Sequence, residues 1–176
     1  KDKILDTVDT AYLEEQGVKE IVAKSDEILK KVRYVEERKS MQRFLRELGQ
    51  DSGLSIYGVD EVKKYLETSK VKTLLISEGL NQKNITIKCS VCGYSEKKNL
   101  KFSEMLPFES TFSNTPCQKC GRKELSIEDK KDLIDLLSEI ATPNNAEIEI
   151  ISTSHEEGEM LLKSFGGVAA ILKYKS

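Results

Sequence analysis

Histidine is almost absent from the sequence: a single residue, His155, occurs among 176. A Ser-His-Asp triad or a two-histidine zinc hydrolase site therefore needs that residue or is impossible. His155 stands at the expected start of a helix, where a solvent-facing first-turn residue is the ordinary arrangement. The sequence also lacks a Gly-x-Gly-x-x-Gly motif and a Walker loop for binding phosphate. We therefore predict no catalytic residue and no small-molecule substrate, and we interpret the chain as a binding module.

Long apolar runs and an excess of one charge are missing as well. No apolar stretch approaches the roughly 20 residues that span a bilayer. The 28 basic and 30 acidic residues nearly cancel, so any RNA contact has to be local. No signal peptide is visible, although the sequence begins at Lys1 rather than at Met. We expect a cytoplasmic, reducing setting, a monomeric chain and no membrane partner.

Cysteine is rare but strictly arranged. The four cysteines form two Cys-x-x-Cys-Gly units, Cys89 with Cys92 and Cys117 with Cys120. Each pair brings two sulfurs within reach of one ion, and the following glycine lets the backbone turn so that amide groups approach the thiolates. Two such half-sites predict a tetrahedral site for zinc. Because four protein ligands leave no open position, we expect the zinc to be structural.

Other uses of the cysteines stay open at this point. Disulfides need an oxidising compartment. A redox Cys-x-x-Cys explains one pair and leaves the other without a role. Iron on four thiolates has the same spacing as zinc, so the sequence does not decide the identity of the ion.

The remaining sequence predicts helices and strands in alternation. Residues 14–48 have helical periodicity, with a shift of the apolar phase near 36–40 that suggests a bend or a second helix. Ser154 and Glu157 have capping-box spacing, and Gly166 is placed to end the helix that follows them. We expect the strands at 54–57, 71–76, 146–151 and 168–174, and the further helices from 59 to 66 and from 128 to 142.

This order predicts a discontinuous α/β domain. Strands separated by helices, with apolar runs in place of alternation, indicate a mixed or mostly parallel sheet that is covered on both faces. We divide the chain into a helical connection (1–48), an α-β-α sandwich with a mixed four-stranded sheet (49–84 and 128–176), and a four-cysteine zinc minidomain (85–127). Within the minidomain, residues 85–88 and 125–127 are expected to be strands.

Four stretches of the sequence are distinctive together: Tyr-Gly-Val-Asp-Glu-Val (57–62), Leu-Leu-Ile-Ser (74–77), Ile-Ser-Thr-Ser-His-Glu-Glu-Gly (151–158) and Phe-Gly-Gly-Val-Ala-Ala-Ile-Leu-Lys-Tyr (165–174). They resemble the C-terminal domain of archaeal class I peptide chain release factors. The resemblance covers nearly the whole chain, and residues 9–39 look like the end of that family's central domain and the helix leading out of it. Some of these motifs, such as Phe-Gly-Gly and Ile-Leu-Lys-Tyr, also occur in the related ribosome-rescue factor Pelota. The cysteine-bearing insert favours the release factor.

The resemblance implies a sandwich similar to the kink-turn-binding ribosomal proteins. It also implies two partners, a translational GTPase of the elongation-factor kind and the ribosome. The family's Gly-Gly-Gln and Asn-Ile-Lys-Ser motifs are absent from the sequence, so peptidyl-tRNA hydrolysis and stop-codon reading are expected to belong to other domains. The alternatives are a kink-turn RNA-binding module with a zinc ribbon, a Pelota-like domain, and a redox or hydrolytic zinc site, which would need an open coordination position.

Overall fold

A computed structural model describes residues 4, 6–12, 14–112 and 114–175 of the chain. Its helices are α1 (Glu14–Gly49), α2 (Val59–Glu67), α3 (Phe102–Phe112), α4 (Leu133–Ala141) and α5 (Glu156–Ser164), with a short 3-10 helix η1 (Thr142–Asn144) after α4. Its strands are β1 (Ser55–Tyr57), β2 (Val71–Ser77), β3 (Gln82–Cys89), β4 (Ser95–Lys101), β5 (Leu125–Asp132), β6 (Glu147–Ile151) and β7 (Val168–Leu172).

Four of the strands form the central sheet in the order β1-β7-β2-β6. β7 is antiparallel to both β1 and β2, whereas β2 and β6 are parallel. The predicted mixed sheet is therefore confirmed, but the sheet is not mostly parallel. All five residues of β7 and all but one of the seven in β2 are buried, which explains their unbroken apolar sequences.

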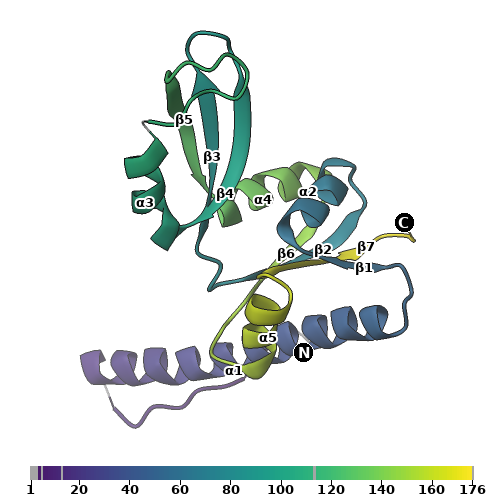
Figure 1. The fold of residues 1–176 in the computed structure, drawn as a ribbon. Coiled ribbons are helices and arrows are strands. Elements are labelled where there is room, and N and C mark those ends of the chain that lie inside the picture. Colours follow the sequence, from purple (N-terminus) through teal and green to yellow (C-terminus); the bar gives the residue numbers. More distant parts are fainter. Residues whose placement is uncertain (1–3, 5, 13, 113, 176) are drawn as a thin grey trace.

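Helices cover both faces of this sheet (Figure 1). On one face α2 and α4 contribute Val62, Leu66, Leu133 and Leu137 to a core that also contains Leu74. On the other face α1 and α5 contribute Met41, Phe44 and Leu161, which pack with Leu75 and Ile171. Successive residues of a strand point to opposite faces, so Leu74 and Leu75 supply the two cores in turn.

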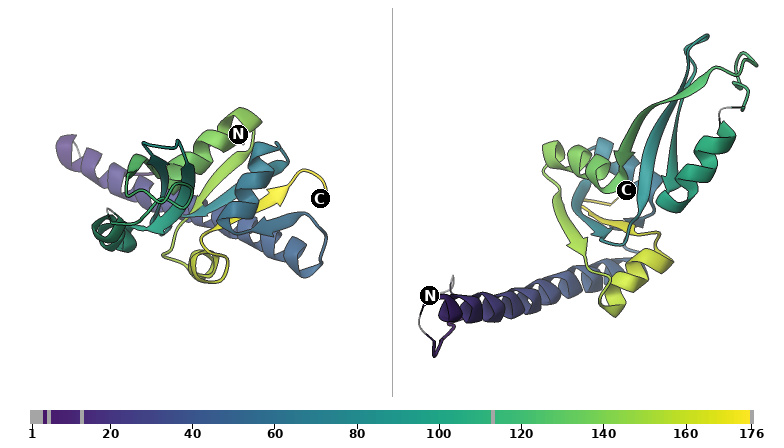
Figure 2. Two further views of the ribbon diagram at one scale, coloured as in Figure 1. Left: turned by 45° about the horizontal axis from the view of Figure 1, so that its top comes forward. Right: turned by 90° about the vertical axis from the view of Figure 1, so that its left-hand side faces the viewer.

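Helix α1 is one continuous helix of 36 residues, so no second helix begins near residues 36–40. The change of apolar phase has another cause. The C-terminal half of α1 packs on the sheet through Met41 and Phe44, whereas apolar residues of the N-terminal half, including Val18 and Val22, are exposed. Figure 2 shows this half extending beyond the sheet. None of the described helices is long and apolar enough to cross a membrane.

The insert forms a separate lobe with its own antiparallel sheet, in the order β4-β3-β5, and with helix α3 (Figure 1). The lobe and the N-terminal half of α1 project on opposite sides of the central sheet (Figure 2). Strands β3 and β5 extend a few residues beyond the bounds predicted for the minidomain.

The helix predicted from Glu128 begins only at Leu133. Residues up to Asp132 continue β5 because they pair with β3, from Lys83 to Ile85. Asp132 then caps α4, since its Oδ1 accepts a hydrogen bond from the amide of Ile134 at 3.0 Å. The helix start therefore follows the capping residue rather than the first charged residue of the segment.

The predicted capping box at the start of α5 is also wrong. The N-cap residue is His155, and its side chain makes no capping hydrogen bond. The Ser154 hydroxyl lies 2.9 Å from the Ser152 hydroxyl, and Glu157 pairs with Arg38 of α1 at 3.1 Å. The predicted end of the helix is confirmed, because Gly166 adopts a left-handed φ of 72°.

The backbone around Gly158 is too close for a side chain. A Cβ at Gly158 would lie 1.8 Å from the carbonyl oxygen of Ser152, a backbone atom that cannot swing away. We expect Gly158→Ala to lower the free energy of unfolding by about 1–3 kcal/mol, although the same change usually favours a helix. Gly49→Ala is the matched control, because nothing lies within 4 Å of that position. Urea denaturation monitored by circular dichroism measures the free energy of unfolding of each variant. Equal stability of the two variants would contradict this packing.

Glu149 on β6 links the sheet electrostatically to α1. Burial raises the pKa of Glu149, an effect opposed by a hydrogen bond from Ser40 and reinforced by Glu147, Glu36 and Glu37. Because the pKa is raised in the folded state, the unfolded chain ionises first as the pH rises. Stability is therefore fully present below the ordinary pKa of the group and declines as the pH passes the raised one.

We accordingly expect Glu149→Gln to unfold at a higher urea concentration than the wild type at pH 7. The difference should disappear below about pH 4, where both states of the wild type are protonated. The change Glu27→Gln, at an exposed position on α1, controls for the loss of one negative charge. A midpoint difference that stays constant with pH would show that ionisation of Glu149 is not its cause.

Candidate metal centre

The sheet of the lobe brings the two cysteine pairs together. Cys89 is the last residue of β3, and the loop that follows it carries Cys92. Cys117 and Cys120 precede β5, whose first residue, Leu125, pairs with Cys89. Strand pairing thus sets the two loops side by side at the end of the lobe far from the central sheet (Figure 1). The four residues proposed from the sequence lie at one place.

The two cysteine loops have the same backbone geometry. In the first loop, the amide of Cys89 donates to the carbonyl of Tyr94 at 2.8 Å, and the amide of Gly93 donates to the carbonyl of Cys89 at 3.0 Å. The second loop repeats this pattern between Cys117, Arg122 and its own glycine, at 2.8 Å for both bonds. Both glycines have positive φ angles, 69° and 73°, as expected for the tight turn.

The sulfur atoms are spaced as a tetrahedral ion would require. All four Sγ atoms lie within 4.8 Å of one another. The distance from Cys89 to Cys120 is 3.7 Å, as is that from Cys92 to Cys117. A zinc–sulfur bond of about 2.3 Å gives a sulfur–sulfur separation of about 3.8 Å in a tetrahedron, whereas a disulfide needs about 2.05 Å. The arrangement is compatible with a metal site, and all four are free cysteines.

The thiols influence one another when no cation is present. The pKa of Cys89 is lowered to about 7, mainly because the amide of Cys92 donates to its sulfur and the amide of Val91 adds to this effect. The pKa of Cys92 is raised to about 11. The amide of Tyr94 lowers it, but burial and the neighbouring sulfurs outweigh that effect. Four thiolates at neutral pH therefore require a positive charge among them, which a bound cation would supply.

The hydrophobic core of the lobe is small. Its buried members are Ile85, Ile87, Leu100, Met105 and Phe112. They lie between the sheet and α3, and the described part of the chain shows no comparable cluster around the cysteine loops. A core of this size benefits from an additional crosslink at its far end.

His155, expected to face solvent, instead lies against the ring of Tyr34 in a cavity between α1 and residues 152–155. The sequence did not predict this cavity, because its two walls are separated by more than a hundred residues. Contacts such as that of Glu37 with Ser152 become visible only in the folded chain.

Residues 34–176 match the family model described as eRF1 domain 3. The chain is 39% identical over 176 residues to peptide chain release factor subunit 1 of Methanococcus maripaludis strain C6, which covers 99% of this chain and 42% of the relative. It thus spans about two fifths of the length of this curated relative. It is also similar to the solved C-terminal domain of a peptide chain release factor from Methanosarcina mazei, with a TM-score of 0.82, 37% identity and coverage of 94% and 99% of the two chains.

More distant structures share the fold. Dom34 of S. cerevisiae has a TM-score of 0.51 at 21% identity, over 93% of this chain and 34% of Dom34. An archaeal Pelota has a TM-score of 0.52 at 21% identity, over 95% of this chain and 34% of that protein.

Substitution of a cysteine tests whether the cysteine loops stabilise the lobe independently of the sandwich. We expect Cys117→Ser to increase amide hydrogen exchange in β3, β4 and β5, because it removes one of the four sulfurs that join the two loops. Strands β2 and β7 should stay protected, since their cores contain none of the cysteines. Exchange mapped by mass spectrometry measures both regions, with Ser90→Ala, in the first cysteine loop, as the control for a substitution that leaves all four sulfurs in place. Loss of protection in β2 and β7 would mean that the lobe and the sandwich unfold as one unit.

Proposed function

The chain belongs to the eRF1 domain 3 family, and on this premise we propose that it is the C-terminal interaction domain of an archaeal peptide chain release factor subunit 1. The observation that carries this proposal is the similarity to the C-terminal domain from Methanosarcina mazei, which extends over nearly all of both chains. The lobe and the sandwich are both included in that similarity, since 94% of this chain is covered.

The domain's role in this proposal is to dock a translational GTPase of the elongation-factor kind and to hold the factor on the ribosome. Dom34, described as a translation termination-like factor, interacts with Hbs1. An archaeal Pelota has been described bound to the ribosome with ABCE1. These proteins share the fold of this chain, so they support a docking role by structural analogy.

We further propose that the chain has no catalytic activity of its own. Its sequence contains neither Gly-Gly-Gln nor Asn-Ile-Lys-Ser, and we assign peptidyl-tRNA hydrolysis and stop-codon reading to other domains of the full-length factor. In this division, residues 1–48 connect to the preceding domain, 49–84 and 128–176 form the docking sandwich, and 85–127 form the minidomain. The proposed setting is the cytoplasm, where the ribosome is found.

We propose that Cys89, Cys92, Cys117 and Cys120 hold one structural zinc ion. The sulfur spacing fits tetrahedral zinc, and four thiolates leave no position for water or substrate. Bound zinc would offset two of the four thiolate charges and close the lobe as a zinc ribbon, without a part in any reaction. The likeness of the sandwich to kink-turn-binding ribosomal proteins is part of the same proposal and rests on its α-β-α layers.

The docking role is tested by binding of an archaeal elongation-factor GTPase to the immobilised chain. We expect a complex at low and moderate salt in the presence of a non-hydrolysable GTP analogue, because docking surfaces of stable partners bury enough apolar area to withstand screening. An immobilised protein of similar size and net charge but different fold is the control. Absence of a complex at both salt concentrations would contradict the proposed role. Tight binding of a kink-turn RNA instead would favour the RNA-binding alternative.

A further inference from the structure

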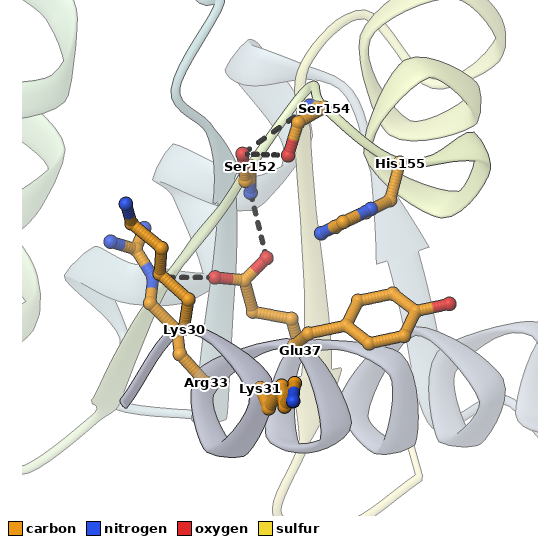
Figure 3. A pocket seen from close by; sticks show the side chains of 8 residues that line it. Lys30, Lys31, Arg33, Glu37, Ser152, Ser154 and His155 are labelled. Atoms are coloured by element: carbon orange, nitrogen blue, oxygen red, sulfur yellow. Dashed lines mark hydrogen bonds and ion pairs between the residues drawn. The ribbon is translucent and has the colours of Figure 1, made fainter. Parts of the chain in front are cut away.

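A cavity of about 380 Å³ lies between α1 and the segment that joins β6 to α5. Its lining includes Lys30, Arg33, Glu37, Ser152, Ser154 and His155. Figure 3 shows Lys30 and Arg33 on one side of Glu37, His155 on the other, and the two serines above. Its volume lies within the range of about 300–1,000 Å³ found for ligand pockets.

On the cationic side of the cavity, Arg33 and Lys30 have hydrogen-bond donors that are available to an anion. Nε of Arg33 donates to Glu37 at 2.6 Å and Nη2 donates to the carbonyl of Ile150 at 3.3 Å. Its Nη1 makes no hydrogen bond to any of the described residues. Lys30 pairs with Asp26 at 2.7 Å, but both side chains are mostly exposed, and such a pair is worth little. Lys30 can therefore turn to an anion at small cost.

The acidic groups around the cavity are already engaged. Glu37 accepts hydrogen bonds from Arg33 and from the amide of Ser152, one at each oxygen. Outside the lining, Glu78 accepts hydrogen bonds from the Ser152 hydroxyl and from the amide and hydroxyl of Thr153. The hydroxyl of Ser152 lowers the pKa of Glu78 most, followed by the Thr153 amide, so this carboxylate stays ionised and anchors the loop.

The opposite side of the cavity is an aromatic surface. The imidazole of His155 lies with its centroid 4.1 Å from that of the Tyr34 ring, at an angle of 49°. Neither nitrogen of His155 has a hydrogen-bond partner among the described residues. The ring is held by packing on Tyr34, lines the cavity and extends toward Glu37 (Figure 3). Planar side chains placed in this way stack with unpaired nucleobases.

The two serines present a hydrogen-bond acceptor. A hydroxyl has one proton, and that of Ser152 is donated to Glu78 at 2.7 Å. The 2.9 Å contact between the serine hydroxyls therefore uses the proton of Ser154. The oxygen of Ser154 is left with free lone pairs, which can accept a hydrogen bond from the amino group of a base.

We propose that this cavity binds one nucleotide of single-stranded RNA. The base stacks on His155 with its amino group toward Ser154, and the phosphate lies between Lys30 and Nη1 of Arg33. A duplex does not fit this arrangement, because its bases are stacked on one another and are not free to enter. The site is a local contact and needs no overall positive charge, in keeping with the net charge of −2. The proposal does not depend on the proposed GTPase docking.

The test is fluorescence anisotropy with the whole chain and labelled oligo(A) about 10 nucleotides long, a length typical of single-strand binding sites. We expect His155→Ala to weaken binding about tenfold at every salt concentration, because it removes the stacking surface. His155→Phe should restore most of the affinity. Lys30→Gln should instead reduce the slope of log affinity against log salt by about 0.7, since one phosphate contact is lost.

Lys19→Gln is the matched control for Lys30. Lys19 is also on α1, its side chain has the same 73% exposure, and it forms the same kind of ion pair with Glu15 at 2.7 Å. It lies outside the cavity, so its substitution should leave binding unchanged. Thermal unfolding of each variant verifies that the chain is folded.

Four outcomes would overturn the proposal. Equal loss of affinity in Lys19→Gln and Lys30→Gln would mean that the RNA is attracted nonspecifically to positive charge on α1 and is not bound in the cavity. Binding of the duplex as tightly as the single strand would exclude an inserted base. Full affinity in His155→Ala, or no binding of oligo(A) at about 50 mM salt, would show that the cavity does not receive RNA.

Discussion

Burial of strands β2 and β7 on both faces determines how the other elements are arranged. Their side chains contribute to both hydrophobic cores, because alternate residues face opposite sides of the sheet. Both faces must therefore be covered, by α2 and α4 on one side and by α1 and α5 on the other. The parallel partner of β2 is β6, which lies far along the chain, and the crossover between them has room for an insert. The lobe occupies this crossover and contributes no strand to the central sheet.

Because the lobe shares no strand with the sandwich, it has to be held together by its own contacts. Its five buried apolar residues lie between the sheet and α3, and the cysteine loops lie beyond them at the far end. Two identical turns place four sulfurs at separations that suit one tetrahedral ion. On this account the apolar core fixes the register of the strands, and the proposed ion fixes the ends of the loops.

The sequence was informative wherever a signal was local. The Cys-x-x-Cys-Gly spacing identified four residues that the fold brings together, and the apolar runs at 71–76 and 168–174 indicated strands buried on both faces. Sequence patterns gave wrong or missing predictions where the local structure depends on contacts with residues far away in the sequence. β4 and α3 were not predicted, and Glu128 to Asp132 resembled a helix start until β3 was present to pair with it. Ser154 had capping spacing, but Ser152, held by Glu78, competes for its hydroxyl. The cavity beside His155 was invisible for the same reason.

The proposed sharing of one ion by four thiolates would close the lobe, on a sandwich that is stable without it. Its most direct test is metal analysis of the purified chain by mass spectrometry, combined with titration of the thiols before and after chelation. We expect one zinc per chain and four thiols that react slowly until the metal is removed. A chain without bound metal, with its cysteines in disulfides or all freely reactive from the start, would contradict it.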